Sequence, residues 1–266
     1  MIYDELYDEW RNQPYMDSCT EKFEIRDGVA IIPEGTTKIG NRAFEDCSSL
    51  ESVTIPESVT EIANCAFYRC TSLESVTIPE SVTKIGDNAF DGCSSLESIT
   101  LPESVTSIGW YAFSGCTSLK NITLPDSVTF LGENAFSGCT SLESITISKS
   151  VTRIDHYVFN DCSSLKSITI PESVTRIEQN AFKGCASLKN VAIPESVREI
   201  EEYAFEGCTS LTTVILPVRV RDINLTAFYK CPSLSTIYVP AKTTDYYIEL
   251  LPEKFHGKIV ELAPEK

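Results

Sequence analysis

The chain has 266 residues, of which 42% are hydrophobic and 23% are charged, a composition typical of folded rather than disordered proteins. Its formal net charge is −16 at pH 7. This charge opposes sequence-independent binding to nucleic acid or to anionic lipid, because both need Lys and Arg to neutralise negative charge. No run approaches the roughly 18 apolar residues of a membrane-spanning helix, so neither nucleic-acid binding nor membrane insertion is expected.

Residues 1–24 are predicted to form an N-terminal cap. Apolar side chains recur there at helical spacing, at Tyr3, Leu6, Tyr7 and Trp10. An amphipathic helix of this kind would cover the open end of a repeat array, and a helix that binds a partner is the alternative. The segment lacks the basic and apolar regions of a secretion signal. We expect a cytoplasmic location for the chain as given, or a cell-surface or secreted one if the N-terminus was trimmed, and whether Met1 is the natural start stays open.

A repeat of 23 residues dominates the chain from residue 25 to residue 240. This region opens with the run FEIRDGVAII, whose Asp27-Gly28 pair predicts a hairpin turn. From Ile32 the period holds through nine cycles without insertion, and nine phenylalanines mark it: Phe44, Phe67, Phe90, Phe113, Phe136, Phe159, Phe182, Phe205 and Phe228. This period predicts a solenoid in which each repeat is one coil.

The letters of one repeat predict the shape of the coil. Leu73, Val76 and Ile78 predict a short strand with its apolar residues inward, which Pro79 ends because it has no amide hydrogen. A second, shorter strand is expected within residues 81–85, and the run GDNAFDGCSSL predicts a tight helical or 3₁₀ turn. We therefore expect a mainly β, right-handed superhelix with two narrow parallel sheets and short turns.

Nine of the eleven cysteines share the same period. They are Cys47, Cys70, Cys93, Cys116, Cys139, Cys162, Cys185, Cys208 and Cys231. Equivalent residues of a solenoid stack about 4.8 Å apart, farther than the usual Cβ separation of a disulfide. We interpret them as a ladder of buried free thiols, with redox sensing or metal binding as the alternatives. Cys19 and Cys65 lie outside the ladder, and Cys65 occupies a variable position where we expect exposure and possible reactivity.

The repeat pattern degrades after Leu234, and residues 241–266 are predicted to form a C-terminal cap and tail. Thr244 is expected to cap a short helix that ends at Pro252. A last short strand is expected within residues 259–262.

The run IPESVTKIGDNAFDGCSSL resembles the repeat of the BspA-like, or Treponema-pallidum-type, leucine-rich repeat family. The resemblance covers about four fifths of the chain. It implies a curved solenoid, a form often found in bacteria of the gut or mouth and in some protozoa. Several members of the family are surface proteins implicated in binding host proteins or other cells. The family has no catalytic residues to carry over.

No catalytic, cofactor or metal site is predicted. The chain has two histidines, His156 and His256, and neither stands in a zinc-binding motif. It also lacks a nucleophile elbow, a phosphate loop and a dinucleotide-binding glycine pattern. The residue types therefore predict a protein that is not an enzyme and needs no cofactor.

Aromatic residues replace polar ones at a few positions that the coil pattern does not require. These candidate contact residues are Trp110, Tyr111, Phe130, His156, Tyr157 and Tyr203. We expect them to form an aromatic ridge that contacts a protein, and the alternative is that each ring packs on the turn of the neighbouring coil. The expected function is a noncatalytic protein-interaction scaffold, with an extracellular adhesion module as the alternative. The partner's identity and the oligomeric state stay open.

Overall fold

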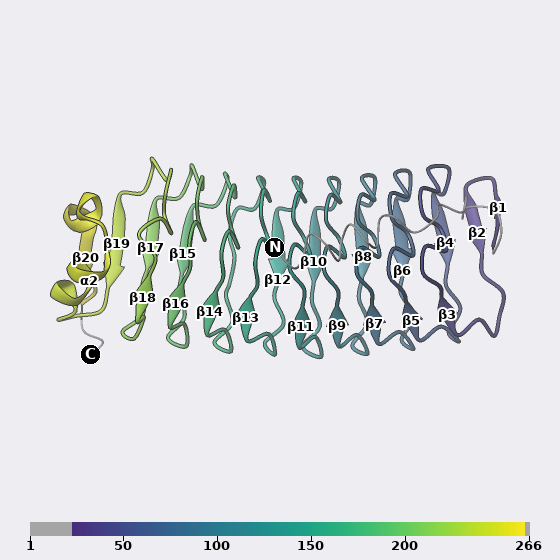
Figure 1. Cartoon of the computed structure of the whole chain (residues 1–266), viewed down its shortest axis with the longest axis horizontal. Helices are drawn as coiled ribbons and strands as arrows, with labels where there is room; N and C mark the ends of the chain where they lie inside the picture. Colours follow the sequence, from purple (N-terminus) through teal and green to yellow (C-terminus); the bar gives the residue numbers. More distant parts are fainter. Residues whose placement is uncertain (1–22, 264–266) are drawn as a thin grey trace, which may run out of the picture.

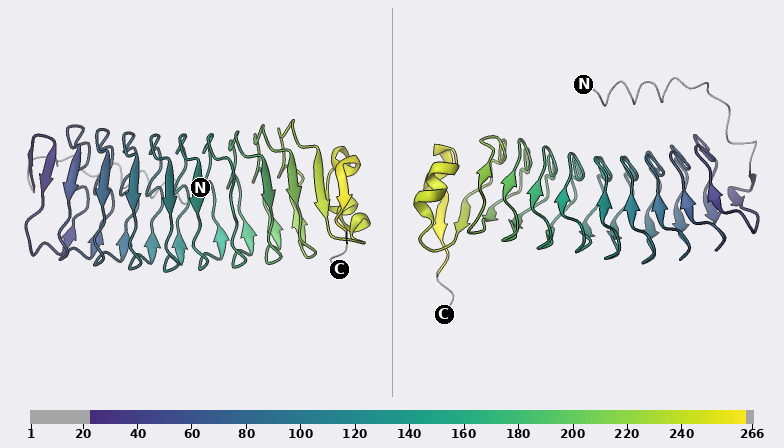
Figure 2. Two further views of the ribbon diagram at one scale, coloured as in Figure 1. Left: turned by 180° about the vertical axis from the view of Figure 1, so that it is seen from behind. Right: turned by 60° about the horizontal axis from the view of Figure 1, so that its bottom comes forward.

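The computed structural model describes residues 23–263, which form a mainly β solenoid of about ten coils. The coils stack along one long axis, and equivalent strands lie side by side from coil to coil (Figures 1 and 2). The predicted fold class is confirmed. The predicted N-terminal helix lies outside the described residues.

The first side of each coil contributes a short strand to a parallel array. Its strands are β2 (Val29–Ile31), β4 (Ser52–Thr54), β6 (Ser75–Thr77), β8 (Ser98–Thr100), β10 (Asn121–Thr123), β12 (Ser144–Thr146), β15 (Asn190–Ala192), β17 (Thr213–Ile215), β19 (Thr236–Val239) and β20 (Ile259–Glu261). The central residue of each three-residue coil strand, such as Val76 in β6, is buried, while its neighbours face outward. At residues 167–169 the strand is reduced to the single bridge Thr146–Thr169.

The second side carries two-residue strands, shorter than the predicted 81–85. They are β3 (Lys38–Ile39), β5 (Glu61–Ile62), β7 (Lys84–Ile85), β9 (Ser107–Ile108), β11 (Phe130–Leu131), β13 (Arg153–Ile154), β14 (Arg176–Ile177), β16 (Glu199–Ile200) and β18 (Asp222–Ile223). The preceding residues turn the corner instead, because the Val82 N–H donates to Pro79 O at 3.0 Å.

The third side is a series of turns that also form a hydrogen-bonded ladder. In the turn around Phe113, the N–H groups of Tyr111, Phe113 and Gly115 donate to carbonyl groups of the next coil, at 2.9, 2.8 and 2.7 Å. Tyr111 and Gly115 both have left-handed backbone conformations, with φ of 57° and 67°. Glycine and asparagine recur at these two positions because they adopt such conformations most readily.

The interior contains the predicted spine and the predicted thiols. Consecutive phenyl rings from Phe44 to Phe228 stack with centroids 5.0–5.9 Å apart and interplanar angles of 17° or less. Each ladder thiol from Cys70 to Cys231 is free and donates to the carbonyl oxygen of the phenylalanine 26 residues earlier, as Cys116 does to Phe90 at 3.2 Å. The thiols therefore fill space and also bond neighbouring coils.

Two cysteine predictions were wrong. Cys47 is disulfide-bonded rather than free. Cys65 is fully buried, and burial raises the pKa of its thiol well above the ordinary value, which opposes the reactivity expected from its variable position.

The second sheet is interrupted between β11 and β13. In several earlier coils the residue after this strand is a glycine that lies against the preceding coil: a Cβ on Gly109 would come within 2.6 Å of the backbone of Gly86 and Asp87. Asp155 occupies the equivalent position, but so do Glu178 and Glu201 in the next two coils, where the strands remain paired. In the coil of Asp155, Ser148 replaces the usual proline, and its buried hydroxyl donates to Val128 O at 2.7 Å.

Different structures close the two ends of the described solenoid. At the N-terminal end β1 (Glu24–Arg26) pairs with β2 in an antiparallel hairpin, as the Asp27-Gly28 turn predicts. At the C-terminal end lie α2 (Thr244–Leu250), the 3₁₀ helix η1 (Glu253–Lys258) and β20. The N-cap of α2 is Thr243 rather than the predicted Thr244, and no side chain caps it. The 3₁₀ helix η1 was not predicted.

Candidate functional site

Two large aromatic side chains are exposed on adjacent coils of the second side. Phe130 lies in β11 and is in register with Ser107 of β9, while Trp110 follows β9 by two residues. Each is 42% exposed. The indole lies against Gly132, since a Cβ on that glycine would be 2.6 Å from Trp110 Cδ1. We call Trp110 and Phe130 the contact pair.

The other candidate residues are half-buried, so the predicted ridge is only partly exposed. Tyr111, Tyr157 and Tyr203 share one column of the solenoid, and all three have φ of 56–57°. Other coils have Asn88, Asn134 and Asn180 in this column, and these residues also have positive φ. The residue type varies along the column, but the left-handed backbone conformation does not. The three tyrosines are partly exposed, as expected, and their contact with a partner stays a prediction.

Tyr203 is separated from the contact pair. It lies four coils beyond Tyr111, which is roughly 19 Å at the usual spacing of stacked strands. Its ring packs edge to face against Tyr229 with centroids 6.4 Å apart, and Lys183 lies 6.0 Å from the ring centroid. Sequence reasoning missed Tyr229, which is 44% exposed, although its aromatic letter in the last coil was a usable signal.

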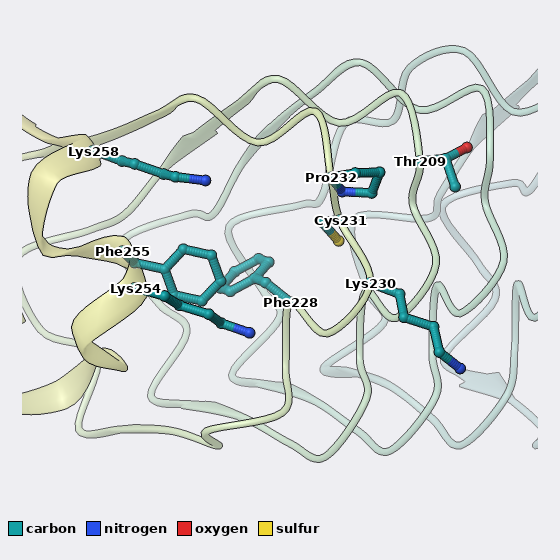
Figure 3. Close-up of a pocket in the computed structure, with 8 residues that line it drawn as sticks. All are labelled: Thr209, Phe228, Lys230, Cys231, Pro232, Lys254, Phe255 and Lys258. Carbon is teal, nitrogen blue, oxygen red and sulfur yellow. The ribbon is translucent and has the colours of Figure 1, made fainter.

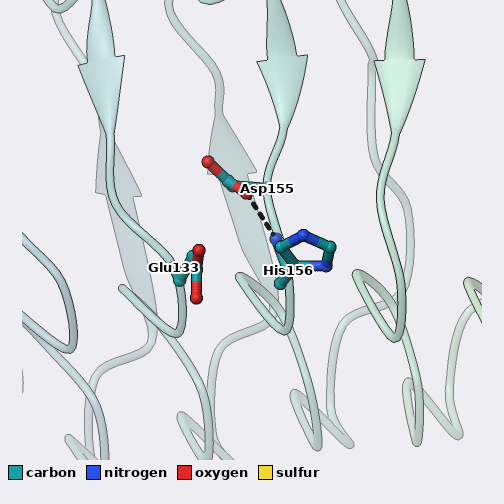
Figure 4. A group of neighbouring side chains, drawn as sticks. All are labelled: Glu133, Asp155 and His156. Atoms are coloured by element: carbon teal, nitrogen blue, oxygen red, sulfur yellow. Dashed lines mark hydrogen bonds between the residues drawn. The ribbon is translucent and has the colours of Figure 1, made fainter. Parts of the chain in front are cut away.

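His156 stands in a small group of potential metal ligands. Donor atoms of Glu133, Asp155 and His156 all lie within 4.8 Å of one another (Figure 4). One oxygen of Asp155 accepts the His156 backbone N–H at 2.9 Å, and Arg153 pairs with the other at 2.7 Å. Burial, followed by the charge of Asp155, raises the pKa of Glu133. The Arg153 guanidinium already neutralises Asp155. The group is therefore better described as an ion pair than as a cation-binding site.

No catalytic constellation was identified among residues 23–263. The ring of the second histidine, His256, lies 2.9 Å from Leu251 O at the C-terminal cap, far along the chain from His156. Among the same residues no helix is long and apolar enough to cross a bilayer.

Comparison with known proteins identifies the repeat. Residues 28–143 and 131–249 match the family described as BspA type leucine rich repeat region, in six copies. The chain belongs to this family. Repeat proteins of this kind generally mediate protein–protein interaction or adhesion, and they are typically not enzymes. No curated protein sequence matches the chain.

The chain is similar to solved structures of bacterial leucine-rich repeat proteins. A leucine-rich repeat protein from Bacteroides ovatus is 32% identical, with a TM-score of 0.68 over 88% of this chain and 69% of that one. A leucine rich cell surface protein from Faecalibacterium prausnitzii is 37% identical over 70% of this chain and 58% of that one, with a TM-score of 0.49. The Treponema pallidum leucine rich repeat protein is 29% identical over 77% and 79%, with a TM-score of 0.45.

Proposed function

We propose that this protein is a noncatalytic scaffold that binds a protein partner through the contact pair, with Tyr111, His156 and Tyr157 at its margin. The observation that carries this proposal is the exposure of Trp110 and Phe130 on adjacent coils of the second side. Except for Leu225, the equivalent positions of other coils hold polar residues such as Asn64 and Ser107. Neither ring is needed to complete a coil.

The chemistry of the surface suggests the kind of partner. Binding energy at protein interfaces concentrates in a few residues, and tryptophan is among the most enriched. Asp87 and Glu133 flank Trp110 in the same column, and the chain as a whole carries a formal charge of −16. A partner with an apolar pocket and a basic rim fits this surface, because opposite charges favour encounter and register.

The test restores the residues of the repeat. Trp110→Asn combined with Phe130→Ser gives the contact pair the side chains found at Asn64 and Ser107. Affinity capture from a lysate of the source cells, quantified by mass spectrometry, should show a partner that wild type retains and the double variant loses by about 30-fold, as expected for about 2 kcal/mol.

The matched control is Leu225→Ala, which removes a 67% exposed apolar side chain elsewhere on the solenoid. It should retain the partner. The melting temperature of the double variant should stay within about 2 °C of wild type, since surface substitutions change stability little. Identical capture by wild type and the double variant would reject the contact pair as a binding site, and a large fall in melting temperature would show that the rings belong to the core.

A further inference from the structure

The C-terminal end of the solenoid holds a pocket of about 490 Å³ between the last turn and η1. Phe228, Cys231, Pro232 and Phe255 form its apolar walls, and Lys254 and Lys258 reach over it from η1 (Figure 3). This volume lies in the range of small-molecule sites.

The pocket exists because the C-terminal cap covers the last coil less completely than another coil would. Within the spine each phenyl ring lies nearly parallel to its neighbours, as Phe205 and Phe228 do at 12°. Phe255 occupies the next place, but its ring meets Phe228 at 86° with centroids 6.2 Å apart. The edge-to-face contact covers part of the last ring and leaves space beside Cys231.

The same missing coil leaves backbone donors unpaired. Along the ladder of turns, N–H groups donate toward the C-terminal end, and those of Phe205 and Gly207 still reach the carbonyls of Ala227 and Tyr229 at 2.8 and 3.0 Å. The equivalent N–H groups of the last turn belong to Phe228 and Lys230. Neither has a hydrogen-bond acceptor within residues 23–263. Lys230 has a left-handed φ of 54°, a conformation found in the backbone nests that bind anions.

Positive charge gathers at this pocket although the chain is strongly acidic. Lys254 has no carboxylate partner in the part of the chain that the structure describes, and it lies 4.8 Å from the centroid of Phe255. Lys258 donates to Leu234 O and lies 5.5 Å from the same centroid. Lys230 also lines the pocket and is paired with Glu206 at 3.0 Å. No carboxylate is among the lining residues.

Cys231 reports on the pocket. It is 7% exposed, whereas the other free ladder thiols are fully buried. Its pKa is lowered, first by a hydrogen bond with the Cys208 thiol and also by the charge of Lys254. Cys231 is therefore a natural probe of whether the pocket is filled.

We propose that this terminal pocket binds a carboxylate on an apolar body, either a small aryl or alkyl acid or the C-terminal residue of a peptide. The carboxylate would accept from the Phe228 and Lys230 N–H groups and pair with Lys254 and Lys258, while the apolar body packs against Phe228 and Phe255 in the space beside Cys231. The pocket and the contact pair lie in different coils, so this inference does not rest on the proposed function.

The first test uses 3-phenylpropionate and its neutral counterpart 3-phenylpropanamide as probes, with binding followed by titration calorimetry. The acid should bind at least about tenfold more tightly than the amide, because charge-assisted hydrogen bonds are the stronger ones. It should also slow the alkylation of Cys231 by iodoacetamide. Equal binding of acid and amide, or no saturable binding up to tens of millimolar, would overturn the proposal.

Substitutions of the pocket lysines test whether 3-phenylpropionate binds in the pocket. Lys254→Gln should weaken 3-phenylpropionate by about fivefold or more, and adding Lys258→Gln should weaken it further. Lys166→Gln is the control, since Lys166 is exposed on the first side and pairs with Glu143 at 2.5 Å. Unchanged binding by folded Lys254→Gln, checked by its melting temperature, would contradict the site. Peptides ending in phenylalanine, with a free or an amidated C-terminus, then tell the two sources apart: tighter binding of the free-acid peptide than of 3-phenylpropionate identifies a peptide C-terminus, and the reverse identifies a small acid.

Discussion

The turn around Phe113 and the turn around Phe228 have the same place in the repeat but different neighbours. At Phe113 three N–H groups donate to the next coil, and the ring lies between Phe90 and Phe136, with centroids 5.4 Å away on each side. At Phe228 the next coil is absent, the N–H groups of Phe228 and Lys230 lack acceptors within residues 23–263, and the neighbouring ring is edge on. Inside the array the backbone N–H groups of each turn are hydrogen-bonded to the next coil. Groups available to bind a ligand or partner are therefore expected where the repeat ends or its residues change.

The largest expected effect is the loss of stability when an interior ring is removed, compared with the loss when the ring of the C-terminal cap is removed. Phe113→Ala should lower the free energy of unfolding by about 3–5 kcal/mol, because it opens a cavity between two stacked rings. Phe255→Ala should cost at least about 1 kcal/mol less, since its ring has one aromatic neighbour and borders an open pocket. Urea unfolding measures both. Equal losses would show that the cap is packed as tightly as an interior coil.

Glycine substitutions test the close approach of interior coils. Gly109→Ala should cost about 1–3 kcal/mol, because its Cβ would lie 2.6 Å from the preceding backbone and force the coils apart. Gly257→Ala, in the C-terminal cap, is the matched control, since no atom lies within 4 Å of the added methyl group. Thermal unfolding of the two variants gives the comparison. A Gly109→Ala variant as stable as the control would mean that the coils are spaced more loosely than described.

A smaller, pH-dependent effect compares two acids of one column. Burial raises the pKa of Asp91 to about 6. Burial would also raise the pKa of Glu206, near the C-terminal end, but hydrogen bonds from Lys183 and Lys230 outweigh it and the pKa is lowered. A raised carboxyl pKa destabilises the folded state above that pKa, and the cost is relieved as the pH falls from about 6 toward the unfolded value near 3.9.

Asp91→Asn should therefore raise the free energy of unfolding by about 2 kcal/mol at pH 7 and change it little at pH 4. The measurement is urea unfolding of variant and wild type at both pH values. Glu206→Gln should have the opposite effect at pH 7, because it removes the ion pairs of a group whose folded pKa is lowered. A difference between Asp91→Asn and wild type that does not change with pH would contradict the raised pKa.

Much of the coil could be predicted from the repeat because each recurring position within the 23-residue period has one structural role. The phenylalanine spine, the proline that ends the first strand and the inward cysteines all follow from a fixed period of 23 residues. The ladder of turns was missed because its hydrogen bonds join backbone groups, which leave no side-chain pattern beyond the glycine and asparagine positions. The same requirement explains Cys65, whose variable position is set by a φ of 56° rather than by exposure to solvent.

The candidate sites were less predictable because they depend on what neighbours are missing or displaced. The exposure of Phe130 could be inferred from an aromatic letter on an outward strand position. The pocket could not, since it arises from the angle between Phe255 and Phe228 and from the place where stacking ends. The break in the second sheet was not predictable either, because Asp155 departs from the glycine pattern no more than Glu178 and Glu201 do, and the strands before those two residues stay paired.

Among the residues that the structure describes, the backbone N–H groups of interior turns are hydrogen-bonded to the next coil, whereas those of the last turn are not. Residue-resolved amide hydrogen exchange tests this difference most directly. The N–H groups of Phe113 and Gly115 should exchange slowly, as hydrogen-bonded groups in the array do. Those of Phe228 and Lys230 should exchange at least about a hundredfold faster, since fraying ends open at little cost in free energy. Equal protection of the interior and terminal amides would contradict the account.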